Sequence, residues 1–302
     1  MTAALARFRA LSPRVRAISY MMVMVFCFSI LETIAKYLSR SYPVPMIVWS
    51  RYAVHATFML LLLARMGPRL MRTGMPTGQV FRASLLVGST SCYFMALSYL
   101  PMADTKAISF VAPLLVTAFA VWILHEHVGW SRWAAVIAGF LGVLFIIRPG
   151  GGMLQWPALL PLLAAVFYSL YQIMTRKISD TESPLTTLFY TGIVGCAWMS
   201  IAVPFFWKTP QLHHVPLFLV LGMAAGFGHF MLIKALELEN ASVLSPLGYV
   251  QMVWVILFGF LVFGELPGLT SLIGMAIIVG SGLYVAIGHH FGPREEPDTA
   301  IE

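Results

Sequence analysis

Ten apolar stretches, each long enough to cross a lipid bilayer, occupy most of this 302-residue chain. About 20 apolar residues are needed for one helical crossing. Hydrophobic residues make up 59% of the chain and charged residues only 10%, which is more apolar surface than a soluble core can bury. The sequence therefore predicts an all-α integral membrane protein with ten transmembrane helices, near residues 17–38, 44–64, 82–101, 105–125, 130–147, 155–175, 184–207, 215–236, 241–263 and 268–288.

The basic residues between these stretches gather on one side of the membrane when the N-terminus is cytoplasmic. The cytoplasmic side then holds Arg7, Arg9, Arg14, Arg16, Arg65, Arg69, Arg72, Arg82, Arg132, Arg176, Lys177 and Arg294, against Arg40, Lys106, Arg148 and Lys208 outside. This positive-inside bias predicts a multi-pass protein of the bacterial inner membrane with both termini in the cytoplasm. No small-residue cleavage motif follows the basic N-terminus, so we expect the first span to be retained.

Charge and motifs exclude several classes of function. The net charge is +7, but the basic residues lie at the edges of apolar stretches, so no nucleic-acid partner is expected. The chain lacks a Walker A sequence and the HExxH and GxSxG motifs, so we expect neither ATP drive nor enzymatic activity. The three cysteines lie singly in apolar stretches, which gives no metal spacing. No cofactor is predicted, and a proton or solute gradient would supply the driving force. The sequence leaves the oligomeric state open.

The two halves of the chain repeat one another. Pro45 corresponds to Pro184 and Glu126 to Glu265, each at an offset of 139 residues. Each copy has five predicted spans, and an odd number places the two copies in opposite orientations, as in many secondary transporters. We therefore expect repeats at 17–150 and 151–290, a basic cytoplasmic N-terminus at 1–16, and a disordered cytoplasmic tail at 291–302.

Several short runs resemble the EamA domain of the drug/metabolite transporter superfamily. In the first half they are Leu100 to Ile108, Pro113, Leu124-His125-Glu126, Arg132-Trp133-Ala134, Gly139, Gly142 and Arg148-Pro149-Gly150. In the second half they are Ser242 to Tyr249 and Phe263-Gly264-Glu265. The resemblance covers residues 17–290. It implies ten helices, inverted five-helix repeats and a central cavity for a solute, but it leaves the cargo open among amino acids, nucleotide-like metabolites, vitamins and drugs.

Charged side chains inside the spans are candidates for solute contact, because a charge is costly to place in a bilayer. Glu32 and Lys36 have the spacing and order of a helical ion pair. They either neutralise each other or face the solute, and Lys36 has the further option of snorkelling to the interface. Arg51, with His55 one turn further along, either binds a carboxylate or phosphate or pairs with Glu32.

Two glutamates and two prolines recur in both halves and are expected to shape gates or the frame. Glu126 and Glu265 close the fourth span of each half. Each is either a proton-coupled acid or, as recurrence at opposite membrane faces favours, an acceptor of backbone N–H groups at a helix start. Pro113 and Pro246 fall inside spans, where they mark either a cavity wall and hinge or a kink absorbed by packing.

Polar and aromatic residues in the sixth and ninth spans predict walls of a solute cavity. They are Tyr168, Gln172, Tyr249, Gln251 and Trp254. Tyrosine and tryptophan offer flat surfaces for rings together with a polar group for orientation. His229, beside the small residues of 222–228, is either a buried hydrogen-bond donor or a proton relay.

Together these features predict a secondary active transporter that works by alternating access. Its cargo is expected to be a small zwitterionic or anionic metabolite resembling an amino acid, with export as the preferred direction. Import of a heteroaromatic vitamin such as riboflavin, broad drug export, and passive uniport or channel activity are the alternatives.

Overall fold

The computed structural model describes residues 11–123, 129–147, 156–178, 181–239 and 244–291. These parts of the chain contain helices joined by short turns and no strand. The α-helices are α2 (Pro13–Ser39), α3 (Val44–Met66), α4 (Pro76–Tyr99), α5 (Met102–Ser109), α6 (Ala112–Ile123), α7 (Trp130–Ile147), α8 (Leu159–Ile178), α9 (Pro184–Ala202), α10 (Val215–Leu236), α12 (Gln251–Phe263) and α13 (Leu269–Phe291). Short 3₁₀ turns are η1 (Pro68–Met71), η2 (Trp156–Ala158), η3 (Val203–Phe206), η4 (Leu212–His214) and η5 (Ser245–Val250).

The helical segments overlap the predicted apolar stretches, with bounds that differ by several residues, as for α4, which begins at Pro76 instead of residue 82. Within the described ranges, 7 segments are long and apolar enough to cross a membrane. Three further apolar segments are shorter: Trp133–Ile147, Leu247–Phe263 and Leu269–Tyr284. The prediction of an all-α, multi-pass membrane protein is confirmed.

Caps and prolines determine where several helices begin. The Ser12 hydroxyl accepts the N–H of Val15 at 3.4 Å, and α2 opens on Pro13. Ser183 accepts the N–H of Thr186 at 3.1 Å, and α9 opens on Pro184. A proline at the first helical position loses no hydrogen bond, because its N–H would have no partner there.

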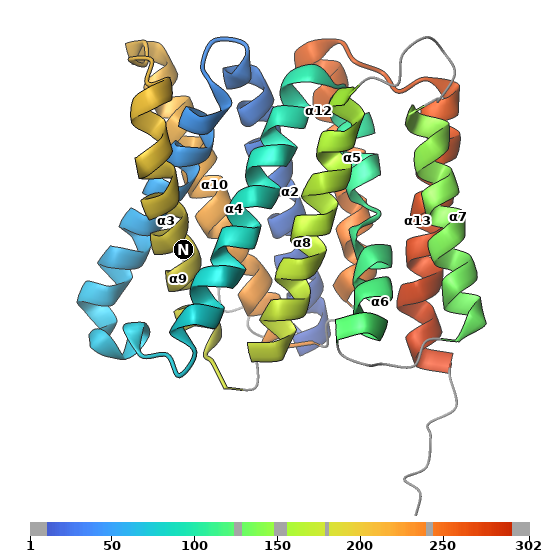
Figure 1. The fold of residues 1–302 in the computed structure, drawn as a ribbon, viewed down its shortest axis with the longest axis horizontal. Helices are drawn as coiled ribbons and strands as arrows, with labels where there is room; N and C mark the ends of the chain where they lie inside the picture. Colours follow the sequence, from blue (N-terminus) through green and yellow to red (C-terminus); the bar gives the residue numbers. More distant parts are fainter. Residues whose placement is uncertain (1–10, 124–128, 148–155, 179–180, 240–243, 292–302) are drawn as a thin grey trace, which may run out of the picture.

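The helices form one bundle in which partners from the two halves of the chain alternate (Figure 1). Helix α3 packs on α9 at one end, α7 packs on α13 at the other, and the pairs α2 with α10 and α4 with α8 lie between them. One apolar core, around Ile47 and Leu221, joins α3 and α10. A second, around Leu114 and Ile278, joins α6 and α13. Large apolar side chains such as Phe205 and Leu261 remain exposed, as expected for helices that face lipid.

The fourth span of the first half is broken rather than continuous. Helix α5 ends at Ser109 and α6 begins at Ala112, directly before Pro113. Proline cannot donate to the carbonyl one turn earlier, so the ladder is interrupted. The Ser169 hydroxyl of α8 donates to the Ala112 carbonyl at 2.9 Å. In the second half, Pro246 lies in η5, before α12. Both prolines therefore stand where regular α-helix is interrupted.

Candidate functional site

Glu32 and Lys36 of α2 do not neutralise each other. The Glu32 Oε1 atom lies 2.7 Å from the Lys106 ammonium of α5 and accepts the Gln251 amide of α12 at 3.0 Å. Lys36 instead forms an ion pair at 2.6 Å with Glu265, which follows α12. The alternative in which Glu32 and Lys36 neutralise each other is wrong, because the opposite charges come from elsewhere: Lys106 on α5 for Glu32, and Glu265 after α12 for Lys36.

Aromatic rings surround the Glu32 and Lys106 pair. The Lys106 ammonium lies 5.5 Å from the centre of the Tyr93 ring and 5.4 Å from that of Phe110. Phe110 in turn meets Tyr249 edge to face at 5.0 Å. The second oxygen of Glu32, Oε2, is also buried, and the Tyr93 hydroxyl lies beside the Glu32 carboxylate. This cluster, built from α2, α4, α5 and α12, pairs one negative charge with one positive charge.

Glu265 reaches its position through a left-handed glycine. Gly264 ends α12 with a φ of 70°, which favours glycine because that conformation crowds a Cβ atom. The Glu265 carboxylate then accepts the N–H of Met102 at 3.1 Å, so it binds the start of α5 instead of its own turn. Lys36 also donates to the Leu100 carbonyl at 2.7 Å. Glu126, the residue of the first half that corresponds to Glu265, lies outside the described residues.

Arg51 of α3 does not pair with Glu32, as one interpretation of the sequence predicted. Its guanidinium donates to the Thr90 hydroxyl of α4, which also lies 3.1 Å from the Tyr52 hydroxyl. The Tyr52 and Phe94 rings lie 5.0 and 6.0 Å from the guanidinium carbon. Glu32 is held elsewhere by Lys106 and Gln251, which leaves Arg51 with neutral partners.

Two predicted histidines come together although they lie on different helices. The rings of His55 and His229 are nearly parallel, with centroids 6.2 Å apart, and Phe28 meets His229 edge to face at 5.0 Å. The Nε2 atom of each histidine is buried without a hydrogen-bond partner. The glycines near His229 differ in how closely they are packed. A Cβ on Gly228 would meet Phe28 at 2.6 Å, whereas a Cβ on Gly226 would meet nothing within 4 Å.

Arg82 is a fully buried residue that the sequence interpretation placed among the cytoplasmic edge charges. That assignment is wrong, because α4 begins six residues earlier than Arg82, at Pro76, and carries the side chain into the bundle. Its Nη2 atom donates to the Thr187 carbonyl at 2.6 Å and to the Thr191 hydroxyl at 2.7 Å. Its Nη1 atom has no partner. The signal in the sequence was Gln79, three residues earlier, whose amide oxygen accepts from Arg82 Nε at 3.4 Å.

The residues predicted to form the aromatic walls of a cavity lie in different parts of the structure. Tyr168 and Tyr171 of α8 stack with centroids 5.7 Å apart, and the Arg82 guanidinium lies 5.0 Å from the Tyr171 ring. The Tyr168 side chain is 39% exposed, so part of this aromatic pair remains accessible. Trp254, by contrast, packs on Phe26 at 4.9 Å.

The remaining predicted wall residues are distributed as follows. Gln251 and Tyr249 belong to the Glu32 cluster, and the Tyr249 hydroxyl is buried without a hydrogen bond. Gln172 is half-buried on α8, next to Tyr171. We call the group that gathers around Arg51 the central cluster; it comprises Arg51, Tyr52, His55, Arg82, Thr90, Tyr168, Tyr171 and His229.

A carboxylate that the sequence interpretation did not single out joins the two halves at the turn between α8 and α9. Glu182 accepts the Thr73 hydroxyl at 2.7 Å, the Gly74 N–H at 2.8 Å and the Gln79 amide at 3.3 Å. Burial raises the pKa of this carboxyl, but the hydrogen bonds outweigh it and leave the pKa below its usual value. Glu182 thereby links the α3–α4 connection of the first half to the second half.

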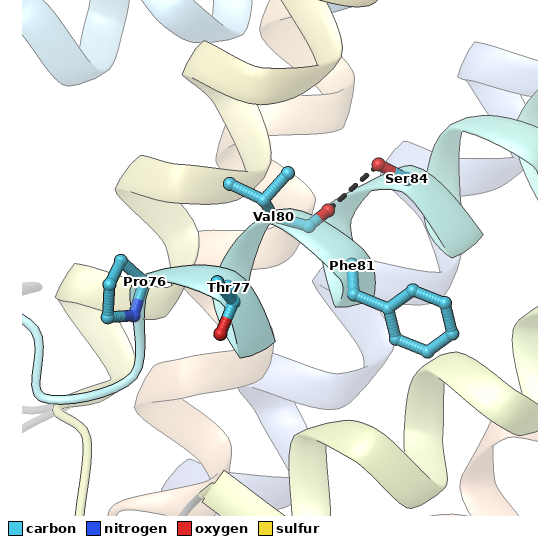
Figure 2. A pocket seen from close by; sticks show the side chains of 5 residues that line it. All are labelled: Pro76, Thr77, Val80, Phe81 and Ser84. Carbon is cyan, nitrogen blue, oxygen red and sulfur yellow. Dashed lines mark hydrogen bonds between the residues drawn. The ribbon is translucent and has the colours of Figure 1, made fainter.

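The surface hollow in Figure 2 lies apart from these clusters. Its lining, Pro76, Thr77, Val80, Phe81 and Ser84, comes from the first turns of α4 alone. Another hollow, between α3 and α10, has a mostly apolar lining that includes Trp49 and Trp207, with the hydroxyl residues Ser50 and Thr57. Exposed apolar faces of this kind suit lipid, so the buried clusters are the better candidates for a solute site.

An apolar helical bundle with charged and aromatic side chains buried between its helices defines a membrane-transport class of protein. The EamA-like transporter family matches residues 15–148 and again 155–287, so the chain belongs to this family of the drug/metabolite transporter superfamily. The double match accounts for the repeat in the sequence.

Relatives named as transporters match nearly the whole chain. An S-adenosylmethionine uptake transporter of Rickettsia prowazekii (strain Madrid E) is 27% identical over 277 residues, covering 91% of this chain and 94% of the relative. A riboflavin transporter of Vibrio cholerae is 29% identical over 287 residues, covering 93% and 96%. A pseudopaline exporter of Pseudomonas aeruginosa is 27% identical over 262 residues, covering 84% and 90%. A solved crystal structure shares the fold, with a TM-score of 0.65 at 18% identity, covering 92% of this chain and 98% of its own. These relatives point to a transporter rather than an enzyme.

Proposed function

We propose that this protein is a secondary carrier that moves a small zwitterionic or anionic metabolite, resembling an amino acid, across the bacterial inner membrane by alternating access. Ten spans, the seven long segments and the three shorter ones, would form two five-helix repeats, 17–150 and 151–290, of opposite orientation. Both termini would be cytoplasmic.

The pairing of helices supports an inverted repeat. When each helix of the first half is exchanged for its equivalent in the second, α2 becomes α8, α3 becomes α9, α4 becomes α10 and α7 becomes α13. The contact of α2 with α10 then becomes that of α8 with α4, while α3 with α9 and α7 with α13 map onto themselves. A twofold relation of this kind lets one half rock against the other around a site on the axis.

The central cluster is the observation that carries the proposal. It brings two arginines, two histidines and three tyrosines from α3, α4, α8 and α10 into the interior of an apolar bundle. Charged groups are rare inside spans and commonly line a solute path. Because the cluster draws on both halves, a solute bound there would touch both moving parts.

The ring-rich lining also fits a flat heteroaromatic cargo. The stacked tyrosines Tyr168 and Tyr171 offer such a surface, and a relative is named a riboflavin transporter. Import of a vitamin is therefore the second candidate. Export, the direction named for the pseudopaline relative, is the direction we propose.

Counterflow in reconstituted vesicles tests the carrier proposal. We expect vesicles preloaded with unlabelled cargo to accumulate labelled cargo transiently and with saturation, because a carrier exposes one site to each side in turn. A pH gradient of either sign would test proton coupling in the same vesicles. Linear, unsaturated flux without stimulation from the far side would show a channel and overturn the proposal.

A further inference from the structure

We infer that Arg51 and Arg82 together form a subsite for an anionic group of the cargo, a carboxylate or a phosphate, whose planar body lies against Tyr168 and Tyr171. This rests on the proposed function, and it adds Arg82 as a specificity-determining residue. The inference also restricts the cargo: among zwitterions and anions, the anionic group would bind between α3, which carries Arg51, and α4, which carries Arg82.

Charge balance within the bundle separates these two arginines from the other buried charges. Glu32 is compensated by Lys106, and Lys36 by Glu265. In the described part of the chain, no carboxylate lies within ion-pair distance of Arg51 or Arg82. Their hydrogen-bond partners are instead neutral hydroxyl, amide and carbonyl groups. An uncompensated buried charge is unfavourable, so a negatively charged group of a ligand would be stabilised beside these arginines.

Each arginine also retains an unused donor. Arg51 Nε and Arg82 Nη1 are buried and have no hydrogen-bond partner. Arg51 is 8% exposed and Arg82 0%. A guanidinium presents donors in a fixed plane that matches the oxygens of carboxylate and phosphate groups. One anionic group would therefore satisfy both the missing charge and the missing acceptors.

Neighbouring side chains place the two arginines around one region. Arg82 donates to the Thr191 hydroxyl of α9, and a Cβ on the adjacent Gly192 would lie 3.2 Å from His55, which is one turn along α3 from Arg51. Arg51 stands over the Tyr52 ring at 5.0 Å, and Arg82 stands over the Tyr171 ring at 5.0 Å. The arginines thus flank a shared group of rings, and Tyr168, which stacks on Tyr171, supplies exposed surface beside it.

The surroundings favour an anion over a neutral or cationic group. The side chains around the two arginines are the histidines His55 and His229 and the tyrosines Tyr52, Tyr168 and Tyr171, which are not carboxylates. The buried carboxylate Glu182 is linked to Arg82 through the Gln79 amide and forms no direct ion pair with it. An ammonium group would meet two positive charges here, so the amino group of a zwitterion would have to lie away from them.

Matched pairs of probes test the inference with the purified full-length protein. Indole-3-acetate against indole-3-acetamide tests a carboxylate, and riboflavin 5′-phosphate against riboflavin tests a phosphate; each pair keeps its ring system. We expect the charged member of at least one pair to raise the melting temperature and to bind at least tenfold more tightly than its neutral counterpart. Equal binding within both pairs, or no binding by either charged member, would overturn the inference.

Variants separate a binding role from a structural one. Arg51→Gln and Arg82→Gln should each lower the affinity for the charged probe at least tenfold and leave that for the neutral probe unchanged. Their melting temperatures without ligand should equal or exceed that of the wild type, because an uncompensated charge has been removed. Arg65→Gln, at an exposed site on α3, should change neither property. If Arg82→Gln still prefers the charged probe over the neutral one to the same degree as the wild type, the assignment of Arg82 to the subsite is overturned. Counterflow that does not distinguish charged from neutral cargo would contradict the subsite but leave the carrier proposal standing.

Discussion

At the scale of single residues, buried polar side chains obtain partners from distant parts of the chain. Glu32 binds residues 74 and 219 positions away, and Lys36 binds one 229 positions away. Each of these contacts joins helices that are far apart in sequence. Replacing one member would leave the other charge buried and unpaired, which is why such pairs hold helices in a fixed arrangement.

Glu182 provides a pH-dependent contact between the two halves. Its pKa is lowered by the hydrogen bonds from Thr73, Gly74 and Gln79, which outweigh burial, so its stabilisation is complete above the pKa of the unfolded chain, about 4.3. The stabilisation is lost as pH falls through the lower pKa of the folded state. Glu182→Gln should therefore cost about 1–3 kcal/mol at pH 7 and little in acid.

Thermal unfolding of both proteins from pH 7 to pH 3 checks this prediction. The difference in stability should shrink as the pH falls below about 4. Glu237→Gln is the control, because the Glu237 side chain is 50% exposed and forms a local pair with Lys234. A difference that stays constant with pH would contradict the role of the carboxylate charge.

At the scale of elements, close approach of helices decides where the functional side chains lie. A Cβ on Gly195 of α9 would come within 2.3 Å of the Tyr52 ring, and one on Gly192 within 3.2 Å of His55. Helix α9 therefore packs closely against two side chains of the central cluster, Tyr52 and His55. The same closeness joins α7 to α13, where a Cβ on Gly142 would meet the Gly274 carbonyl at 2.9 Å.

Gly195→Ala should displace Tyr52 and destabilise the protein by about 1–3 kcal/mol, because the added methyl group overpacks the α3–α9 contact. Gly226→Ala is the matched control, since nothing lies within 4 Å of its added Cβ and alanine favours the helix by about 0.5–1 kcal/mol. Melting temperatures should fall for the first variant and stay equal or rise for the second. Equal melting temperatures in Gly195→Ala and wild type would show that Tyr52 has room to move.

At the scale of the whole molecule, the inverted repeat makes a prediction about topology. In the proposed topology, five spans in the first repeat would place the connection near residue 150 on the outer side of the membrane, and ten spans would return the C-terminus to the cytoplasm. Alkaline phosphatase fused after residue 150 should be active, whereas a fluorescent protein fused after residue 302 should fluoresce. Activity of the phosphatase at both positions would contradict the even number of spans.

Much of this architecture follows from local sequence patterns. Hydropathy located the helical segments, Pro113 and Pro246 marked the interruptions, and the recurring motifs identified the family. These properties depend on a residue and its near neighbours, because a bilayer requires about 20 apolar residues per crossing wherever the segment lies. The pairing of charges could not be predicted from local patterns. Glu32 and Lys36 have the spacing of an ion pair, yet each has its partner on another segment.

The sequence by itself therefore determined the class of fold, the repeat and three of the charged residues inside the bundle, Glu32, Lys36 and Arg51, whereas it assigned the buried Arg82 and the largely buried Lys106 to the edges of the membrane. Only the tertiary structure decided which charges are compensated, that Arg82 is buried without an ion-pair partner among the described residues, and that Glu182 connects the two halves. The physical reason is that electrostatic compensation depends on distances between helices, and packing at sites such as Gly195 and Gly228 sets those distances. Neither the spacing of residues along one helix nor their hydropathy contains that information.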